Sequence, residues 1–217
     1  MNTNERFSRQ RDIVPADRLA ECQITVVGVG AIGRQVALQL AAMGGPTLTL
    51  IDFDTVEESN IASQGFRERD LGRPKVEATA EACLEINSRL DVTALNERFR
   101  RRTQPGNALF CCVDKIDARR LIWEAVKDRI AFFADGRMTA EVIRILTACD
   151  TAGQQHCPTT LFTPEEAFAG SCTSKMTVLA ASIAAGLMIS QFSRWLRRLP
   201  VEKDQTLNLL AGELTCA

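Results

Sequence analysis

Residues 23–54, QITVVGVGAIGRQVALQLAAMGGPTLTLIDFD, decide the fold of this chain. An apolar run ends in the pattern Gly28-x-Gly30-x-x-Gly33, and a segment with apolar residues on one helical face follows it. A second apolar run then ends at Asp52. The stretch therefore predicts a strand, a glycine turn, a helix and a second strand.

Each glycine of the turn has its own physical role. Gly28 allows a tight turn, Gly30 lets backbone N–H groups approach a phosphate, and Gly33 lets the helix lie close to the strand. Because the amino end of a helix also favours an anion, the turn predicts a nucleotide site. Asp52 lies where a dinucleotide enzyme holds its ribose hydroxyl, so the pattern alone leaves the kind of nucleotide open.

The rest of the chain continues the alternation of helices and strands. We expect helices at 74–89 and 116–129 and strands at 92–96, 108–113, 131–134, 139–148 and 206–210. These elements predict an α/β protein with a Rossmann-like, mixed but mostly parallel sheet and helices on both faces. We expect a single domain over residues 1–217.

Four segments need a separate interpretation. Residues 1–21 predict a charged N-terminal helical arm that is broken at Pro15. Residues 55–75 are polar and interrupted, which indicates a functional loop, and residues 149–171 lack any period, which indicates a long crossover segment. The apolar stretch 176–192 is short for a membrane span and contains polar residues, so we expect a buried or interface helix.

Composition argues against several classes of protein. The 26 basic and 27 acidic residues give a formal charge of −1, so nothing favours binding to nucleic acid or to a membrane. The polar amino end has no secretory signal, and we expect a cytoplasmic protein. The eight cysteines include no CxxC pair, so neither a disulfide framework nor a zinc site is expected. With His156 as the only histidine and no tyrosine, a Ser-His-Asp triad is also disfavoured.

Several motifs occur together in an order and spacing that resemble one family. Besides the glycine turn they are Arg6-Phe7-Ser8-Arg9-Gln10, Asp52-Phe53-Asp54, Ser59-Asn60-Ile61, Gly72-Arg73-Pro74-Lys75, Asp114 after an apolar strand, and Ser171-Cys172 before a long helix. The set resembles the ThiF/MoeB superfamily, the ubiquitin-activating-enzyme-like adenylyltransferases. The resemblance extends from Arg6 to about Arg197.

This resemblance implies ATP-dependent adenylation of the carboxyl-terminal glycine of a small ubiquitin-like or sulfur-carrier protein, with release of pyrophosphate. Such a reaction needs cations and positioning more than covalent catalysis, because the carboxylate and the phosphate are both anions. By similarity, the three glycines surround the phosphates. The resemblance also implies that Asp52 holds the ribose, Asp54 and Asn60 line the nucleotide site, Lys75 neutralises phosphate charge and Asp114 binds or organises Mg²⁺.

Two further roles follow from the same resemblance. Arg9 resembles the arginine that such dimers insert into the partner subunit's site, which implies a homodimer. Cys172 matches the cysteine that some relatives use to take the activated carboxylate as a thioester. Its place at a helix amino end near Lys175 would favour the thiolate. Cys157 in the crossover segment is the rival nucleophile.

Three features depart from the family's pattern. Ser63 stands where the family usually has an arginine that binds the triphosphate. Arg67, Arg69, Arg73 and Arg137 are the candidates to supply the missing charge. The CxxC pairs that hold zinc in many relatives are absent, so no structural zinc is expected. The chain also ends soon after the long helix, as in minimal bacterial members.

Two other functions remain open. Ser63 supports a catalytically degenerate scaffold or the regulatory member of a heterodimer. The glycine turn and Asp52 would also suit an NAD-dependent oxidoreductase. The oxidoreductase hypothesis leaves Lys75, Asp114 and Cys172 without a role.

Overall fold

The computed structural model describes residues 3–161 and 177–217. The strands are β1 (Gln23–Val27), β2 (Thr47–Asp52), β3 (Asp91–Asn96), β4 (Ala108–Cys111), β5 (Phe132–Thr139), β6 (Val142–Ala148), β7 (Asp204–Asn208) and β8 (Glu213–Cys216). The α-helices are α1 (Thr3–Arg6), α2 (Ala16–Ala20), α3 (Ala31–Met43), α4 (Glu58–Gln64), α5 (Lys75–Ile86), α6 (Ile116–Val126), α7 (Thr151–His156) and α8 (Val178–Leu196). Short 3₁₀ helices are η1 (Ser8–Gln10), η2 (Glu68–Asp70) and η3 (Cys157–Thr160).

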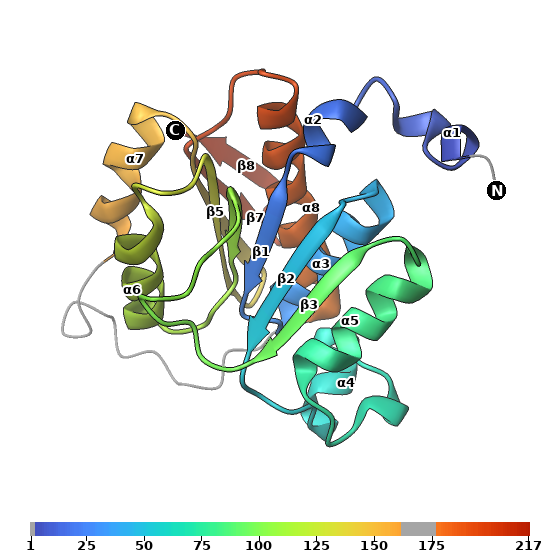
Figure 1. The fold of residues 1–217 in the computed structure, drawn as a ribbon. Coiled ribbons are helices and arrows are strands. Elements are labelled where there is room, and N and C mark those ends of the chain that lie inside the picture. Colours follow the sequence, from blue (N-terminus) through green and yellow to red (C-terminus); the bar gives the residue numbers. More distant parts are fainter. Residues whose placement is uncertain (1–2, 162–176) are drawn as a thin grey trace.

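The strands form one eight-stranded sheet in the order β3-β2-β1-β4-β5-β6-β7-β8 (Figure 1). The five strands from β3 to β5 pair in parallel, and β6, β7 and β8 continue the sheet in antiparallel pairs. The Rossmann-like, mostly parallel sheet predicted from the sequence is therefore confirmed. Because β1, β2 and β4 are parallel and neighbours, their carboxyl ends meet at one edge of the sheet.

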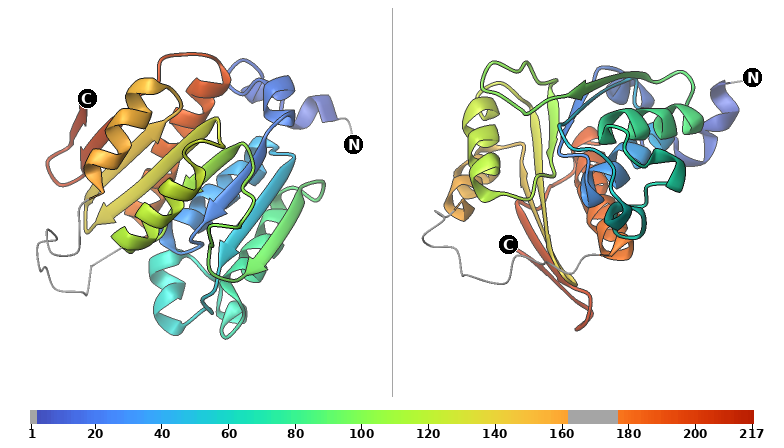
Figure 2. Two further views of the ribbon diagram at one scale, coloured as in Figure 1. Left: turned by 60° about the vertical axis from the view of Figure 1, so that its left-hand side comes forward. Right: turned by 90° about the horizontal axis from the view of Figure 1, so that it is seen from below.

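Helices cover both faces of the sheet, as predicted (Figure 2). Helices α3, α5 and α8 lie on one face, and α6 and α7 lie on the other. Alternate residues of a strand point to opposite faces, so β4 serves two cores. Phe110 packs in the core beneath α3 and α8, and Leu109 packs with Trp123 of α6 in the other.

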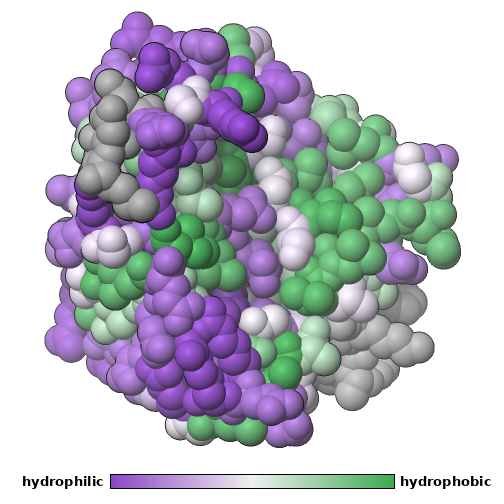
Figure 3. All heavy atoms as spheres, turned by 90° about the vertical axis from the view of Figure 1, so that its right-hand side faces the viewer, coloured by the Kyte–Doolittle hydropathy of each residue, from purple (hydrophilic) through white to green (hydrophobic). Residues whose placement is uncertain are grey.

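The long helix α8 is buried on one side, as the sequence predicted. Ala181, Ala184 and Ala185 are fully buried, and small side chains let α8 lie close to α3. The first turn of α8 is exposed on its other side, where Val178 is 38% and Leu179 is 63% exposed. An apolar area lies beside a strongly hydrophilic one on the face shown in Figure 3. No helix in the described part of the chain is long and apolar enough to span a membrane.

Two segments that we expected to be irregular contain helices. Within 55–75 the chain forms α4 and η2, and the Glu57 backbone N–H donates to Asn60 Oδ1 at 3.0 Å at the start of α4. Within 149–171 it forms α7 and η3, where Asp150 Oδ1 accepts a hydrogen bond from the Gly153 N–H at 2.8 Å. Both helices are short and polar and depend on such caps, so they show no apolar period. Residues 162–171 lie outside the described residues.

The antiparallel strands also differ from the prediction. We expected one strand to end before Asp135-Gly136, but both residues lie inside β5, which forms a hairpin with β6 around Ala140. Asp135 is tolerated there because two arginines pair with it. The predicted last strand is β7, and β8, whose four residues are all exposed, was not predicted.

Candidate active site

A cavity of about 630 Å³ opens at the carboxyl edge of the parallel strands. It lies between the glycine turn, the ends of β2 and β4, the segment after β3, and the first turns of α5 and α6. Its lining includes Gly28, Gly30, Asp52, Phe53, Asp54, Gln64, Lys75, Arg98, Phe99, Cys112, Asp114, Lys115 and Arg119. The structure thus brings together the glycine turn and most of the acidic and basic residues selected from the sequence.

The three glycines of the turn meet different surroundings. Gly28 has a φ of +85°, and a Cβ atom there would lie 2.8 Å from the Cys112 backbone. A Cβ on Gly33 would lie 1.8 Å from the Gly28 carbonyl oxygen. A Cβ on Gly30 would meet only the Gln64 side chain, at 3.7 Å. Packing therefore requires Gly28 and Gly33, whereas Gly30 leaves open space in the cavity for a ligand.

Two carboxylates and one ammonium form the wall next to the turn. Asp52 is 9% exposed and accepts hydrogen bonds from the Val29 N–H at 2.6 Å and the Asp54 N–H at 2.9 Å. Lys75 Nζ lies 3.3 Å from Asp54 Oδ2, and its side chain is 8% exposed whereas that of Asp54 is 49% exposed. An ammonium has three donors. Lys75 is thus held at the cavity wall with donors left for an anionic ligand.

The other two predicted ligands lie in different places. Asp114 is exposed in the cavity directly after β4. Mg²⁺ in nucleotide sites usually takes one or two carboxylates together with substrate phosphates, so a single exposed carboxylate suits it. No group of three or more metal-ligating side chains occurs among the described residues. Asn60 is buried at the start of α4, bonded to the Glu57 backbone, and does not line the cavity.

Ser63 and the arginines near it do not face the cavity. The Ser63 hydroxyl donates to the Ser59 carbonyl at 2.6 Å within α4. The surface arginines, which are Arg67, Arg69 and Arg73, pair with glutamates on α5. Hydrogen bonds from Arg67 and Arg69 lower the pKa of Glu85 to about 2. None of these side chains lines the cavity.

A buried charge cluster lies at the cavity floor. Arg119, 6% exposed, lines the cavity and donates to Asp135, which is 1% exposed. Arg137 donates to the other oxygen of Asp135 at 2.9 Å and to the Thr160 carbonyl at 2.9 Å. Burial lowers the pKa of both guanidiniums, yet arginine stays charged in proteins. Arg119 therefore lines the cavity, whereas Arg137 does not line it and contacts the cluster through Asp135.

The sequence analysis missed three of the four cavity cations, which we define as Lys75, Arg98, Lys115 and Arg119. Neither Arg98 nor Lys115 has an acidic partner among the described residues. The sequence does contain a pattern from which two of these cations could have been predicted. Lys115 and Arg119 follow Asp114 at the start of a helix, and the beginning of a helix after a parallel strand lies at the ligand edge.

The cysteines are mostly unreactive. Cys112, which we expected in the core, is partly exposed in the cavity lining, whereas Cys111 is fully buried. Burial raises the pKa of the Cys157 thiol to about 12, so this rival nucleophile stays protonated at neutral pH. Cys172 lies outside the described residues.

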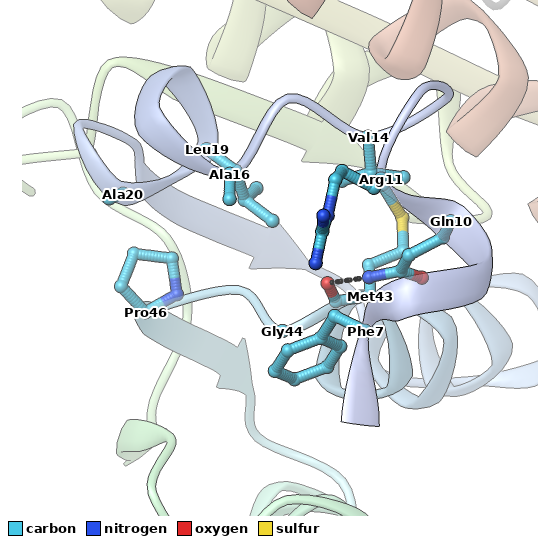
Figure 4. Close-up of a pocket in the computed structure, with 10 residues that line it drawn as sticks. All are labelled: Phe7, Gln10, Arg11, Val14, Ala16, Leu19, Ala20, Met43, Gly44 and Pro46. Carbon is cyan, nitrogen blue, oxygen red and sulfur yellow. Dashed lines mark hydrogen bonds between the residues drawn. The ribbon is translucent and has the colours of Figure 1, made fainter. Parts of the chain in front are cut away.

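The N-terminal arm lies at the opposite edge of the sheet from the cavity. A Cβ on Gly44, at the end of α3, would lie 2.8 Å from the Phe7 ring, and Gln10 donates to the Met43 carbonyl at 2.6 Å (Figure 4). A second cavity of about 310 Å³ lies between this arm and the start of β2. Because α3 has 13 residues, it is about 20 Å long. The exposed Arg9 therefore lies roughly a helix length from the glycine turn of its own chain.

Comparison with known proteins agrees with this geometry. The ThiF family model matches residues 7–212. The molybdopterin-synthase adenylyltransferase of Salmonella typhimurium is 36% identical over 100 residues, which cover 43% of this chain and 40% of that protein. The ThiS adenylyltransferase of Escherichia coli is 35% identical over 118 residues, covering 52% and 45%.

The chain matches less than half the length of these two curated relatives. The crystal structure of Escherichia coli MccB with ATP has a TM-score of 0.77 and 16% identity, covering 99% of this chain and 72% of that one, and it shows the shared fold. Since the family model spans nearly all of it, the chain belongs to the ThiF family.

Proposed function

We propose that this protein adenylates the carboxyl-terminal glycine of a small ubiquitin-like or sulfur-carrier protein with ATP and releases pyrophosphate. The observation that carries the proposal is the cavity whose lining combines the open space at Gly30 with Lys75 and Arg119. Similarity to two adenylyltransferases for sulfur-carrying systems supports the reaction class, and the MccB structure with ATP supports the nucleotide.

The residues suit an attack of a carboxylate on the α-phosphorus. Two anions must approach each other, and nearby fixed cations lower the cost of doing so. Backbone N–H groups at the glycine turn and α3 would hold phosphate oxygens, and Lys75 and Arg119 would balance their charge. Asp52, whose two oxygens already accept backbone N–H groups, would accept a further hydrogen bond from a ribose hydroxyl.

Asp114 would hold Mg²⁺ beside the phosphates. When bound, the ion would neutralise phosphate charge as a Lewis acid. Lys115 and Arg119 follow Asp114 on the same side of the cavity, so this end would carry cations of both kinds.

A homodimer would complete the site with Arg9. The exposed apolar side chains of α8, which are Val178 and Leu179, support a partner surface, since exposed apolar areas often mark interfaces. The test mixes an Arg9→Ala variant with a Lys75→Ala variant. If Arg9 acts in the partner's site, mixed dimers contain one intact site and regain activity that neither variant has alone. No recovery after demonstrated subunit exchange would contradict the arrangement.

After adenylation, the Cys172 thiolate would attack the carbonyl carbon of the carrier's acyl adenylate, which forms a thioester and releases AMP. The buried Cys157 is disfavoured as the nucleophile, because its thiol stays protonated. With carrier and ATP, mass spectrometry should detect an adduct that thiols cleave and that Cys172→Ser abolishes. An adduct that persists in Cys172→Ser and disappears in Cys157→Ser would reverse the assignment.

A catalytically inactive scaffold is the second candidate. Ser63 favours it, because its hydroxyl bonds within α4 and faces no cavity. The NAD-dependent oxidoreductase finds no support in the relatives named above.

Pyrophosphate exchange into ATP tests the proposed reaction. The purified chain should exchange pyrophosphate only with a carrier that ends in glycine, and removal of that glycine should abolish exchange. Asp114→Ala should reduce exchange strongly. Turnover unchanged in Asp114→Ala would refute its role, and no exchange with any glycine-terminated carrier would favour the scaffold.

A further inference from the structure

One buried charge lies outside the cavity and has no part in the proposed reaction. Arg34, in the first turn of α3, is only 2% exposed and directly follows Gly33. No carboxylate forms an ion pair with it in the part of the chain that the structure describes. Burial lowers the pKa of its guanidinium, yet arginine stays charged in proteins. Because a buried charge is costly, its hydrogen bonds indicate what it holds in place.

The guanidinium of Arg34 joins three helices. Its Nε donates to the Gly65 carbonyl at 3.1 Å, and its Nη1 donates to the Thr79 hydroxyl of α5 at 3.2 Å. Its central carbon lies 4.5 Å from the centroid of the Phe66 ring. Gly65 ends α4 in the left-handed conformation, with a φ of +75°. A rigid, planar fork of donors suits two such acceptors, so Arg34 fixes the end of α4 against α3 and α5.

The end of α4 carries one residue of the cavity wall, Gln64. Its Oε1 would lie 3.7 Å from a Cβ on Gly30, so the carboxamide borders the open space at the glycine turn. This oxygen is buried and has no hydrogen-bond partner among the described residues. Gln35, the neighbour of Arg34 on α3, donates to the Gln64 carbonyl at 3.5 Å. Since buried polar atoms are normally hydrogen-bonded, the free oxygen indicates a ligand group in that space.

We propose that Arg34 is a positioning residue of the nucleotide site, which holds the end of α4 so that the Gln64 carboxamide meets the ligand at the glycine turn. This inference rests on the proposed function, since it needs a nucleotide in the cavity. Arg34 does not line the cavity itself and acts only through Gln64. Its loss should weaken the binding of ATP and leave the chemical step, which depends on the cavity cations, nearly unchanged.

The test is a double-mutant cycle measured by calorimetric titration of ATP with Mg²⁺. Arg34→Met keeps a long side chain and removes the donors. Arg34→Met and Gln64→Ala should each weaken ATP binding about tenfold, the usual effect of one lost hydrogen bond to a charged ligand. The double variant should bind no more weakly than either single variant, because both substitutions remove the same contact. In pyrophosphate exchange, Arg34→Met should raise the KM for ATP about tenfold and leave kcat within about twofold.

Two further variants separate positioning from stability. Val36→Ala is the matched control, because Val36 is fully buried on the same helix and does not line the cavity. It should lower Tm and leave ATP binding unchanged. Arg34→Lys keeps the charge but lacks the planar fork. It should weaken ATP binding less than Arg34→Met, and this loss should also disappear in the Gln64→Ala background, which provides the same cycle if Arg34→Met does not fold.

Several results would overturn the positioning role alone. These are unchanged ATP binding in the Arg34 variants, losses that add to that of Gln64→Ala, and an equal loss of ATP binding in Val36→Ala. In each of these cases the wild type still binds ATP, so the proposed function stands. A wild type that binds no ATP would overturn the proposed function, and the role of Arg34 with it.

Discussion

Positive side chains gather in two regions, and the two are neutralised differently. The surface arginines pair with glutamates that are themselves more than 40% exposed, so water and salt screen them. The cavity cations lie at a concave site, where Arg119 shares a buried carboxylate with a second arginine. Charges act more strongly in such partly dry surroundings. The charge absent at Ser63 is therefore to be sought on α6 and α5, not in the loop beside Ser63.

The largest effect is expected from a substitution that breaks the buried charge cluster. Asp135→Asn leaves the buried Arg119 and the partly buried Arg137 without a counter-charge, and we expect a loss of about 3–5 kcal/mol in the free energy of unfolding. Urea denaturation measures it. The matched control is Glu85→Gln in the exposed network, whose loss should be far smaller. Equal losses in the two variants would show that burial does not distinguish the two regions.

The next effect concerns catalysis. Lys75→Ala removes a nearly buried ammonium from the cavity wall, and pyrophosphate exchange should fall about 100-fold or more. Arg67→Ala removes a cation of the surface network and should leave exchange at the wild-type rate. If both variants lose the same activity, the surface arginines take part in the site and the comparison fails.

Two alanine substitutions in the glycine turn should separate structure from binding. Gly28→Ala forces a side chain into a left-handed conformation against the Cys112 backbone, and we expect a loss of about 1–3 kcal/mol in stability. Gly30→Ala has room for its methyl group, so stability should change little while ATP binding weakens. Thermal unfolding and calorimetry measure the two quantities. A Gly30→Ala variant that binds ATP normally would remove Gly30 from the ligand site.

The smallest expected effect is a pH dependence in the surface network. The pKa of Glu85 is lowered to about 2 by Arg67 and Arg69, below its ordinary value of 4.5. Its stabilising contribution is therefore complete above pH 4.5 and is lost as the pH falls through about 2. The difference in Tm between wild type and Glu85→Gln should shrink over this range and also in high salt. A difference that grows on acidification would contradict the pairing.

The sequence predicted the part of the fold that depends on local patterns. The turn from Gly28 to Gly33 and the apolar runs around it determine β1, α3 and β2 within 30 residues of chain. The sequence also placed Asp52 and Asp114 at the ligand edge, because in a parallel sheet that edge follows from strand direction. Lys75 was placed there only by the family resemblance.

The remaining features depend on contacts that no local pattern records. Arg119 meets Asp135 across 16 residues, from α6 to β5, and nothing in the sequence marks the two as partners. The caps at Asn60 and Asp150 hold polar helices that have no apolar face. Strand β8 has only four residues and all of them are exposed, so it is too short for its alternation to stand out and it has no buried face.

Calorimetric titration of ATP with Mg²⁺ into the wild type and into Ser63→Arg tests the central claim most directly. The account predicts that the wild type binds ATP and that Ser63→Arg changes the affinity little, because the cavity cations already supply the charge. It also predicts that Lys75→Ala, which removes one of these cations, weakens binding strongly. A wild type that does not bind, together with binding regained in Ser63→Arg, would contradict it and identify the chain as a scaffold that lost its nucleotide site.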